Sequence, residues 1–246
     1  MDTAPVDATH AAVEGRESVV FHLPSQLRLW IPAALVLGLD LWSKAWAFRS
    51  LPADQAKPII PRVLEFRRSL NDGAVFGTFT GYVGVFIVAS LFALGFVFYL
   101  FAQSSRAQRS LHWALALILA GALGNLYDRG FIEADVVLVT KQSGEQTKII
   151  GKVLGERPDG RISVGEWPDG KPSKSYDPSE LSVRRQGVVR DFIKFLPRLP
   201  RGLPRIGGYD LWPWVFNVAD AALVCGVGIL LLNCWLDRKP RAPSLT

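Results

Sequence analysis

The segment Leu211–Leu236 reads LWPWVFNVADAALVCGVGILLLNCWL, an apolar run long enough to cross the roughly 30 Å hydrocarbon core of a membrane as a helix. Two polar side chains, Asn217 and Asp220, interrupt its first half. They are three residues apart and therefore share one helix face, with small alanines around them. Burying a carboxylate within such a segment costs free energy, and carboxylates found there commonly have a function. Asp220 therefore indicates a functional site.

Three further segments of the chain are apolar over a comparable length. They are Leu27–Phe48, Tyr82–Ala102 and Leu111–Tyr127. Hydrophobic residues make up 49% of the 246 residues, which favours a protein with several membrane spans over a soluble domain. We therefore predict a mainly α membrane protein with four transmembrane helices and with both termini on one side.

Basic residues beside these segments indicate their orientation. Arg106 and Arg109 lie in the short connection between the second and third segments, and the tail after the fourth is also basic. Because Lys and Arg are enriched on the cytoplasmic side, we predict cytoplasmic tails at 1–26 and 237–246. Residues 1–26 lack the pattern of a removable signal peptide, so we expect the first span to remain in the mature protein.

The region 131–186 differs sharply from the rest of the chain. Its hydropathy falls, and it contains β-branched runs at Val136–Thr140, Thr147–Leu154 and Arg161–Trp167, separated by polar turns. Two turns carry the tripeptide Pro-Asp-Gly, at 158–160 and 168–170. We predict an inserted soluble β-rich module whose ends, near Arg129 and Gly187, lie close together. We interpret it as a spacer or docking module without a catalytic role.

A smaller β region is predicted in the extracytoplasmic loop 49–80, which belongs with the first three helices in a unit spanning 27–130. Ile59–Phe66 and Phe76–Phe79 have the composition of short strands, and Asn71-Asp72-Gly73 between them favours a turn. Gly73 would permit a close approach of the backbone there.

Polar residues also occur in the first and third predicted helices. Asp40 and Lys44 are four residues apart, and we interpret them as an ion pair that orients the helix rather than as catalytic groups. Asn125, Asp128 and Arg129 form a polar end to the third helix that could anchor a catalytic loop. We expect Asp128 to be structural rather than a catalytic acid.

Asp191 belongs to the unit 187–236, which also contains Asp220 and the fourth apolar segment. Two carboxyl groups brought together in a dry site tend to share one proton, which leaves one acid and one base. A water molecule between them could then hydrolyse a peptide bond. The sequence therefore favours acid–base chemistry by Asp191 and Asp220.

Other classes of function have little support. His10, His22 and His112 are scattered and show no zinc-binding spacing, so we predict no metal and no other cofactor. The net charge of +6 is spread over loops and tails instead of one helix face, so we predict no nucleic-acid partner.

Five motifs, in order along the chain, resemble those of lipoprotein signal peptidases, the type II signal peptidases of bacteria. They are Asp40-Leu-Trp-Ser-Lys44, Asn71-Asp-Gly-Ala-Val-Phe-Gly77, Gly121-Ala-Leu-Gly-Asn-Leu-Tyr-Asp-Arg129, Gly187-Val-Val-Arg-Asp-Phe-Ile193 and Phe216-Asn-Val-Ala-Asp220. The resemblance extends from about Leu27 to Leu236 and excludes the region 131–186.

The resemblance implies that Asp191 and Asp220 are the catalytic pair. The positions that it implies to be supporting or substrate-binding are Asp40, Lys44, Asn71, Gly73, Asn125, Asp128, Arg129, Asn217 and Ala219.

The chain departs from the family pattern at Asp72, where Thr is frequent, at Arg190, just before Asp191, and in the long insert. Asp135 is an alternative to Asp191, but it lacks the following Phe-Ile and begins a predicted strand.

The resemblance further implies a monomeric, multi-pass enzyme of the bacterial inner (cytoplasmic) membrane, in contact with lipid and with its active site on the extracytoplasmic side. Its expected substrate is a diacylglyceryl-modified prolipoprotein, cut before the lipidated cysteine. An alternative is a proton-coupled carrier or an assembly factor without enzymatic activity, in which Asp40, Lys44 and Asp220 would form a relay.

Overall fold

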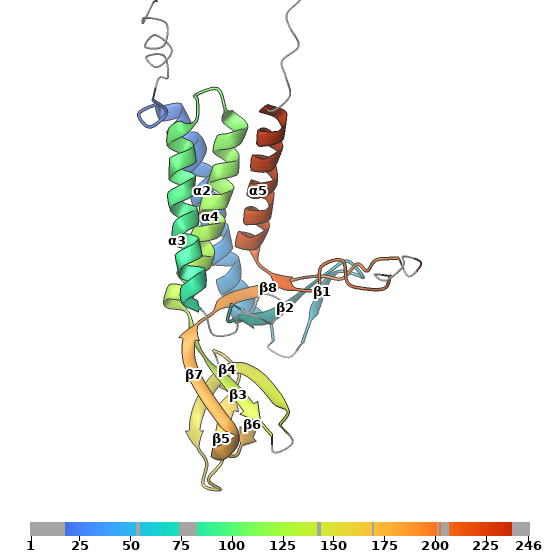
Figure 1. Ribbon diagram of the computed structural model, residues 1–246. Coiled ribbons are helices and arrows are strands. Elements are labelled where there is room, and N and C mark those ends of the chain that lie inside the picture. Colours follow the sequence, from blue (N-terminus) through green and yellow to red (C-terminus); the bar gives the residue numbers. More distant parts are fainter. Residues whose placement is uncertain are drawn as a thin grey trace, which may run out of the picture.

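Four helices lie side by side in the computed structural model, which describes residues 18–52, 55–73, 83–141, 144–168, 170–200, 202 and 207–237 (Figure 1). They are α2 (Leu23–Ser50), α3 (Val83–Gln103), α4 (Arg109–Phe131) and α5 (Val218–Asp237). All four are long and apolar enough to cross a membrane. The chain enters α2 and leaves α5 at the same end of the bundle, as expected for an even number of spans.

The fourth helix begins later than the sequence predicts. The apolar segment Leu211–Leu236 is helical only from Val218, and the short strand β9 (Val215–Phe216) precedes the helix. Pro213 explains part of this difference, because proline disfavours helical geometry in the residue before it. The prediction of one continuous helix over this segment is therefore wrong at its first seven positions.

Helix α4 packs against the other three helices, and its contact with α5 is especially close. A Cβ atom added at Gly124 would lie 2.5 Å from an Asp40 carboxylate oxygen and 3.2 Å from the Ala219 Cβ atom. Glycine at this position thus lets α2, α4 and α5 meet around buried polar groups. Toward the other end of the bundle, an apolar cluster that includes Leu29, Val97 and Leu115 fills the space between the helices.

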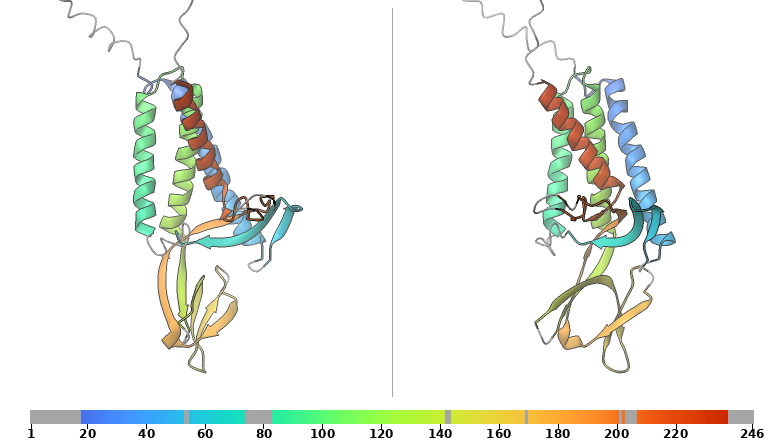
Figure 2. Two further views of the ribbon diagram at one scale, coloured as in Figure 1. Left: turned by 45° about the vertical axis from the view of Figure 1, so that its right-hand side comes forward. Right: turned by 90° about the vertical axis from the view of Figure 1, so that its right-hand side faces the viewer.

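A four-stranded antiparallel sheet lies across one end of the helices (Figure 2). Its order is β1-β2-β8-β9, with β1 at Lys57–Ile60, β2 at Leu64–Asn71 and β8 at Val189–Phe195. The expected strand Ile59–Phe66 is wrong as a single element, because a turn at 61–63 divides it between β1 and β2. The other expected strand, Phe76–Phe79, lies outside the described residues.

The insert forms a second, five-stranded antiparallel sheet of order β6-β5-β4-β3-β7. Its strands are β3 (Glu133–Thr140), β4 (Gln146–Glu156), β5 (Ile162–Gly165), β6 (Pro172–Tyr176) and β7 (Leu181–Gly187). Val137, Val139 and Val164 form its core. The sequence did not indicate β6 and β7, which are rich in polar residues.

The two ends of the insert meet beside helix α4. Glu133 pairs with Gly187 across β3 and β7, and the Val188 N–H donates to the Ile132 carbonyl oxygen at 2.9 Å. The expected closeness of the insert's ends is therefore confirmed.

Trp167 packs the insert against the end of helix α2. Its ring centroid lies 5.7 Å from that of Phe48, within a cluster that also contains Leu51 and Phe192. Its indole N–H donates to the Glu133 carbonyl oxygen at 2.8 Å. The insert thus shares an apolar cluster with the strand that carries Asp191.

We predict that Gly124→Ala lowers the free energy of unfolding by about 1–3 kcal/mol, because the added methyl group forces α2 and α5 away from α4. Thermal unfolding in detergent measures this loss. Gly95→Ala in α3 is the matched control, since a Cβ atom there meets nothing within 4 Å. Equal stability of the two variants would contradict the proposed packing constraint.

Candidate active site

Asp191 and Asp220 line the same cleft, which has a volume of about 530 Å³. Strand β8 supplies Asp191, and the first turn of α5 supplies Asp220. Antiparallel pairing of β2 with β8 places Ser69 opposite Asp191, so the end of β2 borders the cleft as well. The structure therefore brings the two predicted catalytic carboxylates together from distant parts of the sequence.

Asp220 is held by a reciprocal pair of hydrogen bonds at the start of α5. The Asp220 backbone N–H donates to Asn217 Oδ1 at 2.9 Å, and the Asn217 backbone N–H donates to Asp220 Oδ2 at 3.1 Å. This arrangement is a capping box, in which residues three apart satisfy each other's unpaired backbone N–H groups. The spacing of Asn217 and Asp220 thus starts the helix and orients the carboxylate.

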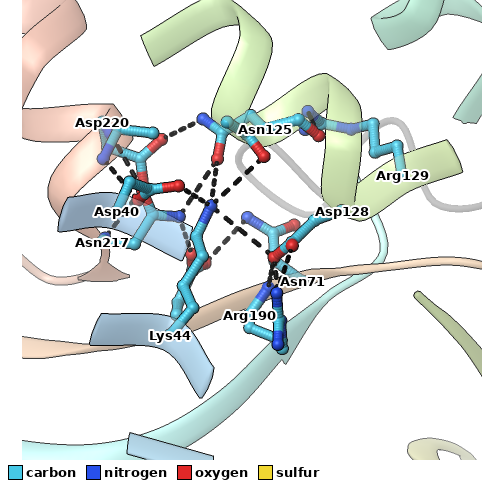
Figure 3. A network of polar contacts seen from close by, with 12 residues as sticks. Asp40, Lys44, Asn71, Asn125, Asp128, Arg129, Arg190, Asn217 and Asp220 are labelled. Carbon is cyan, nitrogen blue, oxygen red and sulfur yellow. Dashed lines mark hydrogen bonds and ion pairs between the residues drawn. The ribbon is translucent and has the colours of Figure 1, made fainter. Parts of the chain in front are cut away.

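Asn217 and Asn125 connect the two carboxylates (Figure 3). Asn217 Nδ2 donates to Asp191 Oδ1 at 2.6 Å and to Asn125 Oδ1 at 3.1 Å. Asn125 Nδ2 donates in turn to Asp220 Oδ1 at 2.8 Å. Asp191 and Asp220 are therefore each hydrogen-bonded, through one carboxylate oxygen, to the side-chain amide of Asn217 or Asn125.

Asn71 holds Asp191 from the other side. Its Nδ2 donates to Asp191 Oδ2 at 3.2 Å, and its Oδ1 accepts from the Gly73 N–H at 2.9 Å. Gly73 has a φ of 90°, a conformation that favours glycine, and a Cβ atom there would lie 2.6 Å from the Phe86 ring. Gly73 thus orients the Asn71 amide through the turn that the sequence predicted.

Asp40 and Lys44 lie beneath this network and form the expected ion pair at 2.8 Å. Asp40 Oδ1 accepts from the Ala219 backbone N–H at 2.8 Å, while Lys44 Nζ donates to Asn125 Oδ1 at 3.2 Å. Figure 3 shows how these contacts join α2 to α4 and α5. Asp40, Lys44 and Ala219 therefore support the site without lining the cleft.

Asp128 is fully buried and forms ion pairs with two basic side chains, those of Arg190 and Lys44. It accepts from the Arg190 backbone N–H at 2.9 Å and from the guanidinium at 2.7 and 3.2 Å, and Lys44 lies 3.6 Å away. Arg190, a departure from the family pattern, thus anchors strand β8 to α4. Arg129 next to Asp128 donates to the Asn125 carbonyl oxygen and lies over the Phe86 ring at 4.9 Å.

Asp135, the alternative to Asp191, has a different environment. It lies on β3 in the insert, and its carboxylate accepts the Val153 N–H at 2.7 Å. It lines a separate pocket with Trp167 and does not line the cleft of Asp220. The Asp135 carboxylate therefore binds a backbone N–H within the insert, whereas the Asp191 carboxylate lies near a second acidic group, Asp220.

One wall of the cleft is apolar and is held by a lysine that sequence reasoning missed. Trp212, Trp214 and Phe216 line this wall together with residues of α5. Lys194 Nζ binds the carbonyl oxygens of Trp212 and Pro213 at 3.0 and 2.7 Å, and it pairs with Asp210 at 3.3 Å. A lone lysine in a strand gives no recognisable motif, although Lys194 follows Asp191 by three residues.

The opposite wall includes residues of the insert. Lys148 and Ile150 of strand β4 line the same cleft as the two aspartates. The insert therefore reaches the cleft, which its interpretation as a spacer or docking module without catalysis did not anticipate. Its sequence showed strands and turns, but not the direction in which the sheet faces.

Comparison with known proteins places the chain in one family. The family profile described as signal peptidase (SPase) II matches residues 32–236. The chain belongs to the signal peptidase II family. A lipoprotein signal peptidase of Shouchella clausii is 34% identical to it over 210 residues, which cover 85% of this chain and 94% of that protein. Another, of Desulfitobacterium hafniense, is 27% identical over 214 residues, covering 87% and 97%.

Two solved structures, each of a bacterial membrane enzyme, share the fold of this signal peptidase. One has a TM-score of 0.55 at 20% identity and covers 90% of this chain and 95% of its own. The other has a TM-score of 0.53 at 21% identity and covers 87% and 94%. Membership of the signal peptidase II family, together with the four apolar helices, makes this chain a protease and a multi-pass bacterial membrane protein.

Burial raises the pKa of the Asp191 carboxyl well above its ordinary value, and the nearby Asp220 carboxylate raises that pKa further. Hydrogen bonds from Asn217 and Asn71 oppose the shift without cancelling it. Asp191 in this peptidase therefore retains its proton to a higher pH than a free aspartate.

We predict that Asp191→Asn stabilises the folded peptidase increasingly as pH rises. The folded wild type binds a proton that the unfolded chain releases near a pKa of about 3.9, so it loses this stabilisation as pH rises through the raised pKa. An asparagine cannot ionise and escapes the loss. Thermal unfolding in detergent between about pH 4 and pH 8 tests this, with exposed Asp159→Asn as control. A gap between Asp191→Asn and wild type that does not change with pH would contradict the prediction.

Proposed function

We propose that this protein is an aspartic endopeptidase that removes signal peptides from diacylglyceryl-modified prolipoproteins, cutting before the lipidated cysteine. Asp191 and Asp220 are the proposed catalytic residues. The observation that carries the proposal is that two carboxylates, joined through Asn125 and Asn217, line one cleft at the end of four apolar helices. Membership of the signal peptidase II family supports the substrate class.

In the proposed mechanism, the two carboxylates differ in protonation. Asp191 begins protonated, in keeping with its raised pKa, and Asp220 is the proposed base. Asp220 takes a proton from a water molecule, whose oxygen attacks the peptide carbonyl carbon. Asp191 then gives its proton to the departing nitrogen as the C–N bond breaks. The two proton transfers balance, and no metal ion takes part in them.

The surroundings of Asp220 suit an apolar substrate segment. A second pocket of about 310 Å³ shares Trp212, Phe216 and Val224 with the cleft and is lined almost wholly by apolar side chains. Val224 is 60% exposed on α5, so this surface is open toward the position of lipid. A signal peptide contains an apolar stretch that could lie along it.

The proposed location of the site is the extracytoplasmic side of the bacterial inner membrane. The connection between α3 and α4, which contains Arg106, and Arg109 at the start of α4 lie at the end of the bundle opposite the sheets (Figure 1). The preference of such basic residues for the cytoplasm supports this orientation. The insert and the four-stranded sheet then form the extracytoplasmic regions.

We further propose that the chain acts as a monomer in contact with lipid. Both carboxylates and every amide bound to them come from one chain, which supports a complete site in a single copy. The exposed apolar side chains of α3 and α5, such as Phe92 and Leu231, supply the surface for lipid contact.

A proton carrier is less well supported. Asp40 and Lys44 neutralise each other at 2.8 Å with no exposed surface, and neither lines the cleft that contains Asp220. A relay would need these groups to exchange protons with a water-filled path.

We predict that Asp191→Asn and Asp220→Asn each lower the cleavage rate of a lipidated precursor by at least about a hundredfold, because neither amide can exchange the required proton. Asp128→Asn should retain more activity, since Asp128 binds Arg190 and Lys44 outside the cleft. A gel assay with purified protein measures cleavage, and thermal unfolding confirms that each variant is folded. Near wild-type cleavage by Asp191→Asn or by Asp220→Asn would refute the assignment of that aspartate as catalytic.

We also predict that a chelator leaves cleavage unchanged. Within the described part of the chain, no three His, Cys, Asp or Glu side chains gather as metal ligands would. Incubating the purified enzyme with chelator before the gel assay tests this. Activity that disappears with chelator and returns with added zinc would overturn the two-aspartate mechanism.

A further inference from the structure

Strand β4 of the insert turns one face toward the catalytic cleft. Ile149 and Val153 pack into the core of the inserted sheet. Because side chains alternate along a strand, Lys148 and Ile150 point to the opposite face, and both line the cleft that contains Asp191 and Asp220. The cleft thus has one wall built by the helices and another built by the insert.

An ion pair fastens this second wall to the catalytic region. Lys148 Nζ lies 2.9 and 3.0 Å from the two carboxylate oxygens of Asp72. The Asp72 side chain is only 2% exposed, so its charge depends on this partner, while Lys148 is 28% exposed. Asp72 directly follows Asn71, which donates to Asp191. The position of strand β4 is therefore tied to the residue that holds a catalytic carboxylate.

We propose that strand β4, through Ile150 and the aliphatic stem of Lys148, is a specificity-determining wall that contacts the mature segment of the substrate, on the far side of the scissile bond from the signal peptide. This inference rests on the proposed function and extends it. Asp72 and Lys148 act as positioning residues that hold the wall in place.

The direction of the substrate follows from the two walls. The helix wall includes Leu223 and Val224 of α5, and it suits the apolar signal peptide. Strand β4 lies beyond the ends of the helices, in both views of Figure 2. A polypeptide whose apolar part lies along α5 therefore reaches β4 with the segment that follows the cleavage site.

The chemistry of this wall indicates which substrate side chains it favours. The ammonium of Lys148 is already neutralised by Asp72, and Ile150 offers only apolar surface. We expect β4 to favour apolar side chains in the mature segment and to be indifferent to acidic ones.

The first experiment tests contact directly, in a binding assay that needs no catalysis. A photo-reactive amino acid replaces Ile150 in an Asp191→Asn background, and a matched variant carries it at exposed Lys174 on β6. Two lipidated precursors are compared: one ends just after the modified cysteine, and the other continues for about ten residues, which extend over roughly 33 Å.

Crosslinking at position 150 to the mature segment of the long precursor, with none at position 174, supports the proposal. Binding of the long precursor without any crosslink at position 150 overturns it. Crosslinking at position 150 to the signal peptide instead would also overturn it, because the substrate would then run in the other direction.

The second experiment tests the positioning pair by exchanging its charges. Lys148→Glu places two carboxylates together, and we expect the KM of the long precursor to rise about tenfold, which corresponds to about 1.4 kcal/mol, and to rise by a larger factor than the KM of the short precursor. The double variant Asp72→Lys with Lys148→Glu should recover most of the KM, which a folding defect would not allow. Lys174→Glu is the control. An unchanged KM in folded Lys148→Glu would overturn the positioning role.

The two proposals can fail separately. If the wild type cleaves neither precursor, the proposed function is wrong, and the crosslink at position 150 still decides whether β4 meets the peptide. If the wild type cleaves both but position 150 never crosslinks, only the inference about the insert is wrong.

Discussion

The buried ion pair of Asp40 and Lys44 is the interaction on which the site depends. Neither side chain has exposed surface, so each charge must be neutralised and hydrogen-bonded within the protein. Asp40 meets this need by binding the backbone N–H of Ala219 at the start of α5, and Lys44 by binding Asn125 on α4. The pair thereby sets the relative positions of three helices, and these positions in turn place the amides that orient the two proposed catalytic carboxylates.

Much of the fold and of the site could be predicted, because its signals are local. Apolar length alone indicates the four helices, and the three-residue spacing of Asn217 and Asp220 predicts their common helix face. The start of α5 was misplaced, since hydropathy does not register the effect of Pro213 or of the cap at Asn217. Strands β6 and β7 were missed because their polar residues lack the alternation that marks a half-buried strand.

The remaining contacts could not be predicted, because they depend on strand register and on distant partners. Arg190 looked like a departure from the family pattern, and only the pairing of β8 with the end of α4 gives it a partner in Asp128. Lys194 binds backbone carbonyl oxygens, which every residue has, so no sequence pattern marks it. Lys148 and Asp72 are 76 positions apart, and nothing local connects them.

The ion pair between Asp72 and Lys148 also bears on how this chain can change over time. Two of the departures from the family pattern, an aspartate at position 72 and the long insert, meet in a single contact. A deletion of the insert would remove the cation that pairs with Asp72, and a neutral residue at position 72 would leave Lys148 without this carboxylate. Loss of either Asp72 or the insert alone breaks this ion pair. We therefore expect the two features to be kept or lost together during evolution.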